Sequence, residues 1–103
     1  EVASVGRWKY ELEAAGKPVK AGRGYFKGSA KAMAAEEAEG FIQVVSDPES
    51  GLLHGSQIIG PHATELIHIF SVALNQKMTI QALSEVIFAH PTLSEVIRDA
   101  CKK

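Results

Sequence analysis

The sequence FIQVVSDPESGLLHGSQII, residues 41–59, decides the fold of this chain. Its first six and last eight residues are rich in apolar side chains, several of them β-branched or aromatic, which favour β-strands. Between these runs, Asp47 to Gly51 are typical turn formers and match the length of a longer hairpin loop. The stretch therefore predicts two adjacent antiparallel strands, residues 41–46 and 52–59.

The residues before this hairpin predict two more strands. One spans residues 1–5, and the other spans residues 19–26 and contains Gly22 and Gly24. Glycine inside a strand indicates a bulge or the close approach of another backbone. We therefore expect either a bulge in this second strand or another backbone close to it.

A helix and a loop complete the first half of the chain. Residues 7–15 predict a helix, because their apolar residues fall on one side and Gly16 is a natural C-terminal stop. Residues 28–37 are rich in alanine, which favours helix, and Ser29 could cap it. We nevertheless predict mostly loop there.

Three predicted helices follow the hairpin, each with apolar residues spaced three and four apart. Thr79 can cap the second helix, and Pro91 is suited to begin the third. Strands first and helices last predict the α+β class, with an antiparallel sheet packed against helices on one side as a two-layer domain. The apolar stripes are Ala63, Leu66, Ile67, Phe70 and Leu74; Ile80, Leu83 and Ile87; and Leu93, Val96, Ile97, Ala100 and Cys101.

Length and composition narrow the class of protein. The 103 residues correspond to one domain, and 46% hydrophobic with 22% charged residues is ordinary for a globular protein. A net charge of −1 suggests neither nucleic acid nor a membrane surface as partner, and no apolar run approaches the ~20 residues of a membrane span. A single cysteine, Cys101, cannot be a redox dithiol, and no G-x-G-x-x-G sequence follows a strand.

The sequence AHPTLSE, residues 89–95, holds the strongest candidate for chemistry. His90 is the type of side chain used most often as a general base, and a carboxylate at Glu95 could fix its tautomer and stabilise its charged form. Thr92 and Glu95 also fit the T-x-x-E capping box, in which Glu95 turns back to the backbone of Thr92. Spacing alone favours the cap, and we expect that one carboxylate cannot serve both roles fully.

A weaker candidate is formed by His62, Glu65 and His68. Two imidazoles and one carboxylate can bind a transition metal. Residues three apart progress steadily around a helix axis, however, so the three side chains fit one ion poorly. We therefore predict solvent-facing or interface residues and no metal site.

The sequence FAHPTLSE, residues 88–95, resembles the C-terminal signature of the dihydrolipoamide dehydrogenases, a family of flavin disulfide oxidoreductases. The resemblance covers essentially the whole chain and is to one domain, the C-terminal dimerisation or interface domain. It implies that residues 1–103 form this single domain and that upstream FAD and NAD domains are absent from this chain. Further matches in the family's order are EVASVG (1–6), ELEAAG (11–16), EGFIQVV (39–45), GSQIIGP (55–61) and ELI (65–67).

This resemblance implies roles for His90 and Glu95 in a homodimer. His90 would take a proton from a dihydrolipoamide thiol in the partner subunit's active site, and Glu95 would orient His90. The peptide between His90 and Pro91 is typically cis in this motif, and the backbone at Pro91 is expected near the partner's flavin. Many relatives carry a second histidine where this chain has Phe88, so we expect one supporting hydrogen bond of the family to be missing.

Cofactors, partners and location also follow from the resemblance. FAD and NAD are expected in the whole enzyme, with neither bound by this chain alone, which is not expected to be active by itself. The expected partner of the enzyme is a lipoyl-bearing subunit of a 2-oxo acid dehydrogenase complex, in the bacterial cytoplasm or the mitochondrial matrix.

Two alternatives remain open. In the first, the domain is a non-catalytic dimerisation module whose His90-Pro91 turn only begins a helix. In the second, it is the interface domain of another disulfide reductase, such as glutathione reductase. Glutathione reductases typically follow His-Pro-Thr with Ser-Ser-Glu-Glu, so Leu93 and Val96 favour the lipoamide branch.

Overall fold

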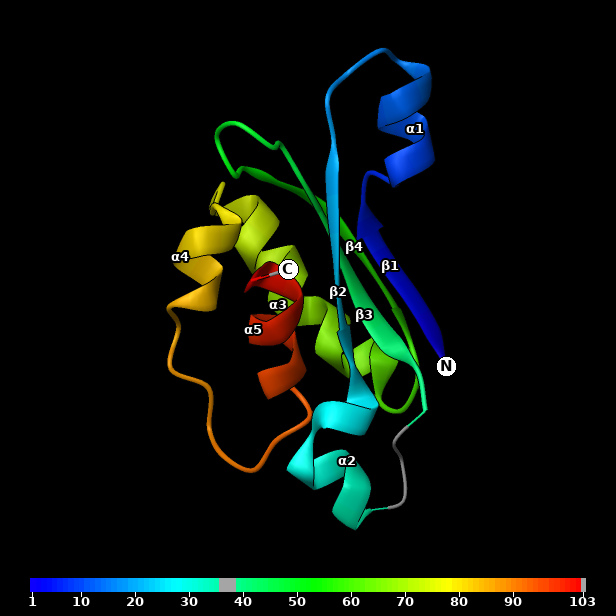
Figure 1. Ribbon diagram of the computed structural model, residues 1–103, viewed down its shortest axis with the longest axis vertical. Helices are drawn as coiled ribbons and strands as arrows, with labels where there is room; N and C mark the ends of the chain where they lie inside the picture. Colours follow the sequence, from blue (N-terminus) through cyan, green and yellow to red (C-terminus); the bar gives the residue numbers. More distant parts are fainter. Residues whose placement is uncertain (36–38, 103) are drawn as a thin grey trace.

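The predicted hairpin lies at the centre of the sheet in the computed structural model, which describes residues 1–35 and 39–102. The strand order is β1-β4-β3-β2, and every neighbouring pair is antiparallel (Figure 1). Each strand matches its predicted range to within one residue at either end. The strands are β1 (Val2–Gly6), β2 (Lys20–Tyr25), β3 (Phe41–Ser46) and β4 (Leu53–Ile59).

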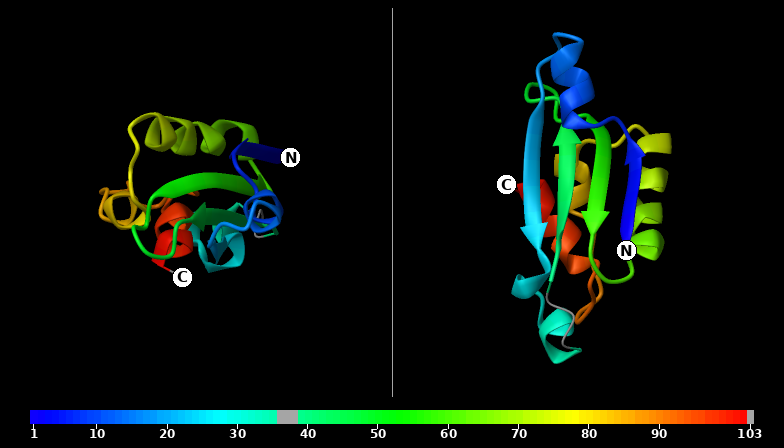
Figure 2. Two further views of the ribbon diagram at one scale, coloured as in Figure 1. Left: turned by 90° about the horizontal axis from the view of Figure 1, so that it is seen from above. Right: turned by 90° about the vertical axis from the view of Figure 1, so that its right-hand side faces the viewer.

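The long helices cover one side of this sheet. Helix α3 packs on β1 and β4, α5 packs on β2 and β3, and α4 lies beside α5. Figure 2 shows α3 and α5 on the same side of the strands, which confirms the predicted two-layer α+β fold. The helices are α1 (Lys9–Ala14), α2 (Ala30–Ala34), α3 (Ala63–Asn75), α4 (Ile80–Ser84) and α5 (Glu95–Lys102), and a 3-10 turn, η1 (Phe26–Gly28), precedes α2.

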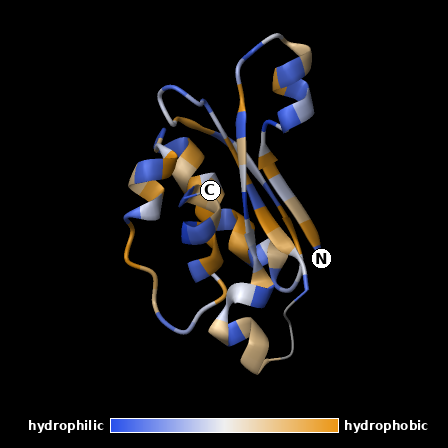
Figure 3. Ribbon diagram, in the orientation of Figure 1, coloured by the Kyte–Doolittle hydropathy of each residue, from blue (hydrophilic) through white to orange (hydrophobic). Residues whose placement is uncertain are grey.

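The core lies between the sheet and these helices. Ile42 and Val44 of β3 and Ile58 of β4 are buried because strand residues two apart share a face. They cluster with Phe70 of α3 and Ile97 of α5. In Figure 3, apolar colours alternate with polar colours along the helices, as amphipathic elements require.

Gly24 allows α5 to lie directly on β2. A Cβ atom at Gly24 would lie 2.5 Å from the carbonyl oxygen of Val96 and 2.9 Å from the nitrogen of Ala100. The predicted close backbone approach is therefore confirmed, whereas the continuous register from Lys20 to Tyr25 shows no bulge in β2. The position of α5 thus depends on a residue without a side chain.

The structure corrects one helix start and one loop prediction in the first half of the chain. Helix α1 begins at Lys9 rather than residue 7, because Trp8 is extended and stands at the N-cap. The alanine-rich stretch forms the short helix α2 where mostly loop was predicted. The Ser29 hydroxyl oxygen accepts a hydrogen bond from the Ala32 nitrogen at 3.2 Å, so the cap and the alanine propensity prevail. Residues 36 and 37 of the predicted loop lie outside the described residues.

Helix α4 is shorter than its apolar stripe predicts. It ends at Ser84, whose hydroxyl donates to the carbonyl oxygen of Gln81 at 2.7 Å, and the Glu85 N–H donates to the same carbonyl at 3.2 Å. Ile87, predicted to face the core, is instead 96% exposed. The stripe prediction was therefore wrong at its last residue.

Helix α5 begins at Glu95 rather than at Pro91. Residues 91–94 form a turn whose polar groups are satisfied without a helix: Thr92 donates its N–H to the Glu95 carboxylate and its hydroxyl to the Ala89 carbonyl. The prediction that Pro91 begins the helix was therefore wrong. The predicted apolar face of α5 is confirmed, and it includes the buried Cys101.

Candidate active site

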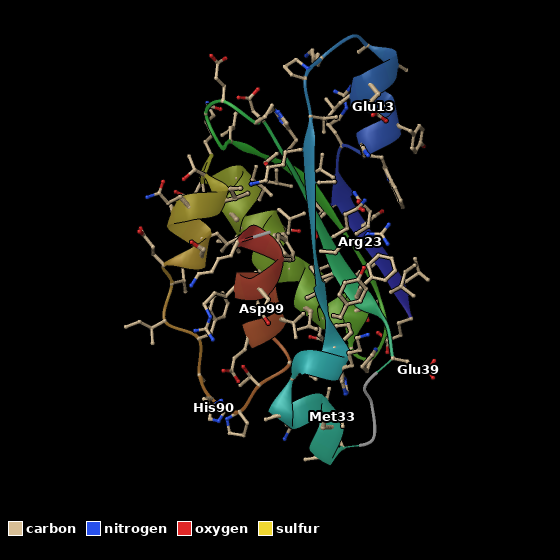
Figure 4. The ribbon with its side chains drawn as sticks, viewed as in Figure 1. Glu13, Arg23, Met33, Glu39, His90 and Asp99 are labelled. Carbon is tan, nitrogen blue, oxygen red and sulfur yellow. The ribbon has the colours of Figure 1, made fainter. Side chains whose placement is uncertain are left out.

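The candidate site lies where the loop after α4 joins α5, on the helical side of the sheet. Figure 4 shows His90 on this loop, with Arg23 on the far side of the strands. The Nδ1 atom of His90 lies 3.0 Å from each carboxylate oxygen of Glu95. The Glu95 side chain is 19% exposed and the His90 side chain 70% exposed. A sheltered carboxylate therefore holds one edge of an imidazole that otherwise faces outward.

The Glu95 carboxylate contacts the backbone of Thr92 and the ring of His90 at the same time. Its Oε1 atom accepts the N–H of Thr92 at 2.9 Å and also contacts His90 Nδ1. Two carboxylate oxygens offer about four acceptor positions, so both contacts form together. Of the predicted capping box, the bond from the Thr92 N–H to Glu95 forms, while the Thr92 hydroxyl donates to Ala89.

The surroundings of Glu95 keep it ionised. Its pKa is lowered first by the N–H of Thr92 and then by the hydrogen bond from His90; partial burial opposes these, and the charges of His90 and Arg98 lower it further. Arg98 places its Nη2 atom 3.7 Å from Oε2. An ionised carboxylate only accepts hydrogen bonds, so Nδ1 of His90 carries the proton. In the neutral imidazole the lone pair then resides on Nε2, the nitrogen that can act as a base.

This lowered pKa predicts a pH-dependent contribution to folding. A carboxyl group with a depressed pKa in the folded state stabilises the protein above its ordinary pKa, and this stabilisation disappears as pH falls through the folded-state value. At pH 7 we expect the wild type to unfold at higher urea concentration than Glu95→Gln, which cannot ionise. The gap should close as pH falls below about 4. A gap of the same size at pH 7 and pH 3 would contradict the ionised state of Glu95.

A pocket of about 260 Å³ opens beside the pair. One wall consists of the end of η1 and the start of α2, from Gly28 to Ala30. The opposite wall consists of His90, Glu95 and the first turns of α5, including Asp99, which Figure 4 labels. Open space therefore adjoins the pair on the side of α2.

The bond between His90 and Pro91, within the site, is cis, as the resemblance implied.

The other sequence candidates do not join this site. In the parts of the chain that the structure describes, His62, Glu65 and His68 do not form a set of three metal ligands. Burial raises the pKa of the Cys101 thiol to about 12, so it is protonated at neutral pH. Within residues 1–35 and 39–102, no helix is long and apolar enough to cross a membrane.

Sequence reasoning missed two contributors to the site. The spacing of Glu95 and Arg98, three residues apart on one helix, is a usable signal for their ion pair. The hydroxyl of Thr92 carried no such signal, because the capping-box pattern directs it to the start of α5, whereas it binds Ala89.

A family model and several known proteins each match nearly the whole length of this chain. The family model "Pyridine nucleotide-disulphide oxidoreductase, dimerisation domain" matches residues 1–101. The dihydrolipoyl dehydrogenases of Haloferax volcanii and Rhizobium etli are 36% and 38% identical to this chain over 102 and 100 residues. These alignments cover 99% and 97% of this chain but only 22% and 21% of those proteins. The chain thus spans about one fifth of the relatives' length.

Solved structures agree with this match. LpdA from Mycobacterium tuberculosis superposes with a TM-score of 0.89 at 25% identity, over 98% of this chain and 22% of that one. The flavoprotein disulfide reductase RclA from Escherichia coli, induced by HOCl, has a TM-score of 0.90 at 18% identity, over 98% of this chain and 23% of its own. The second likeness concerns the fold alone.

Proposed function

The chain belongs to the pyridine nucleotide-disulphide oxidoreductase family as its dimerisation domain, and from this premise we propose that it supplies the general base of a dihydrolipoyl dehydrogenase. The base is His90, and Glu95 orients it. The observation that carries this proposal is the geometry of the imidazole: Nδ1 is 3.0 Å from both Glu95 oxygens while the side chain is 70% exposed. Such a base is directed at a group outside this domain.

The proposed reaction step is a proton transfer. The lone pair of His90 Nε2 takes the proton of a dihydrolipoamide thiol, which leaves a thiolate and an imidazolium whose positive charge Glu95 stabilises. A thiolate is the nucleophile in thiol–disulfide exchange, whereas a thiol is not. A free thiol has a pKa near ~8.5 and is mostly protonated at neutral pH, so a positioned base increases the reactive fraction.

The sequence of this chain has no G-x-G-x-x-G after a strand, which is the pattern of a dinucleotide-binding turn. We therefore assign both cofactors to upstream domains of the whole enzyme, in which residues 1–103 form the single C-terminal domain. The backbone around Pro91 would lie near the partner's flavin.

We further propose that two copies of the domain form the homodimer in which His90 reaches the partner's site. In this family the domain is named the dimerisation domain. The whole enzyme would oxidise the dihydrolipoyl group carried by a subunit of a 2-oxo acid dehydrogenase complex, in a bacterial cytoplasm or a mitochondrial matrix. A similar protein of Arabidopsis thaliana is the mitochondrial dihydrolipoyl dehydrogenase 1.

Mixed dimers test the position of the base. Complete-enzyme subunits carrying His90→Gln are refolded or co-expressed with subunits whose redox cysteines are replaced by serine. Each variant alone should have strongly reduced activity with dihydrolipoamide, while the mixed dimer should regain activity, because one site then combines intact cysteines with the partner's intact His90. If mixing restores nothing although mixed dimers form, His90 does not act across the interface, and the non-catalytic dimerisation module is favoured.

A further inference from the structure

We propose that Thr92 is a positioning residue for His90, with Ser94 holding the Thr92 hydroxyl in place. The inference deepens the proposed function and rests on it, since it concerns how the base is held. The three residues lie within one turn before α5. Of these three residues, only His90 takes part in the proposed proton transfer.

Thr92 connects both ends of the His90–Glu95 contact. Its hydroxyl donates to the carbonyl oxygen of Ala89, the residue directly before His90, at 2.6 Å. Its main-chain N–H donates to Oε1 of Glu95, the oxygen that also contacts His90, at 2.9 Å. The backbone that carries the imidazole and the carboxylate that receives it are therefore both fixed relative to one residue.

The direction of the hydrogen bonds follows from counting hydrogens. The Thr92 hydroxyl has one hydrogen, and the Ala89 carbonyl can only accept, so that hydrogen points to Ala89. The oxygen atoms of Thr92 and Ser94 lie 2.9 Å apart, which makes Ser94 the donor of that bond. Hydroxyls bonded in series polarise and strengthen each other. The series runs from Ser94 through Thr92 to Ala89.

Packing provides little constraint on this loop, so hydrogen bonds decide its conformation. Ala89, His90 and Pro91 are all exposed. The apolar residues that pack on the core are Phe88 before them and Leu93 after them. Between these two anchors, the described contacts that hold the loop are those of Thr92 and Glu95.

The geometry distinguishes this role from ordinary helix capping. A capping threonine turns its hydroxyl oxygen towards N–H groups of the first helical turn. The Thr92 hydroxyl instead points back along the chain to Ala89 and donates. Its loss should therefore loosen the segment around His90 more than the start of α5.

Two substitutions of Thr92 in the complete enzyme separate the hydroxyl from the side-chain shape. Thr92→Val keeps the branched shape and removes the hydroxyl, and Thr92→Ser keeps the hydroxyl. We expect Thr92→Val to lower kcat with dihydrolipoamide by about tenfold to a hundredfold, since small displacements of a catalytic group have effects of this size. Thr92→Ser should stay near the wild type, and Ser94→Ala should fall between the two. Because Ala89 is exposed, water can satisfy its carbonyl and Thr92→Val should still fold.

A second measurement shows which ring nitrogen of His90 carries the proton. The ¹⁵N chemical shifts of the His90 ring, identified by their loss in His90→Gln, reveal which nitrogen carries the proton in the neutral form. In the wild type and Thr92→Ser we expect the proton on Nδ1, and in Thr92→Val a mixture of both tautomers. A purely structural role for Thr92 would lower the unfolding temperature without changing this ratio.

The outcomes separate this inference from the proposed function. If His90→Gln abolishes turnover but Thr92→Val retains wild-type kcat and tautomer, the positioning role is overturned while the base remains. Equal losses in Thr92→Val and Thr92→Ser would also overturn it, because the hydroxyl would not be the cause. If His90→Gln itself keeps full turnover, the proposed function fails regardless of the behaviour of Thr92.

Discussion

Replacing His90 with glutamine in the complete enzyme is expected to lower kcat with dihydrolipoamide by about two to four orders of magnitude, the usual range for a general base. Glutamine can still hydrogen-bond to Glu95, but it cannot take a proton at neutral pH. The side chain is 70% exposed, so the free energy of unfolding should hardly change. Initial rates of NAD reduction and urea unfolding curves measure the two effects separately.

Two controls sharpen this experiment. His68→Gln changes an exposed histidine on α3 and should leave turnover unchanged. Oxidation of NADH by an artificial dye needs no proton from a thiol and should persist in His90→Gln. Turnover of dihydrolipoamide at the wild-type rate in His90→Gln would refute the proposed base. Loss of the dye reaction as well would indicate a damaged protein instead of a missing base.

Gly24→Ala is expected to destabilise the fold by forcing α5 away from β2. The added carbon would lie 2.5 Å from the Val96 carbonyl oxygen and 2.9 Å from the Ala100 nitrogen, both of which are backbone atoms of α5. A helix backbone cannot move aside as a flexible side chain can, so α5 must shift away from β2. Overpacking of this kind costs about 1–3 kcal/mol of the free energy of unfolding. The midpoint of urea unfolding measures it.

Gly28→Ala is the matched control, because an added carbon at Gly28 meets no atom within 4 Å. Its unfolding midpoint should stay close to that of the wild type. Gly24→Ala should also reduce turnover of the complete enzyme, since α5 carries Glu95 at its first residue. An unfolding midpoint equal to that of Gly28→Ala would show that α5 does not contact β2 as closely as described.

The parts of the fold that depend on local pattern could be predicted from the sequence. Two apolar runs on either side of a turn predicted strands β3 and β4. The apolar stripe of α3 repeats regularly enough to predict which face of the helix is buried. Gly22 and Gly24 indicated either a bulge or a close backbone approach, and the structure shows the approach at Gly24. The sequence could not identify α5 as the neighbour. That identity depends on tertiary contacts between residues more than seventy positions apart.

The parts that failed depend on contacts that a sequence pattern does not describe. Helix α4 ends at Ser84 although its apolar stripe continues to Ile87, and periodicity does not show where a helix stops. The sequence presented the contact of Glu95 with Thr92 and its contact with His90 as alternatives, because each sequence motif describes only one hydrogen-bond partner. Only the three-dimensional turn shows that Thr92 and His90 approach the carboxylate together.

The short separation of His90 and Glu95 has a consequence for association energetics. Both residues belong to one chain, five positions apart, and their contact forms within a single domain. Ordering a side chain at an interface costs about 0.5–1.5 kcal/mol of binding free energy. For this imidazole most of that entropy is already lost when the subunit folds. The imidazole is therefore already ordered before it meets a partner surface. Ordering it on binding lowers the affinity for that surface only slightly.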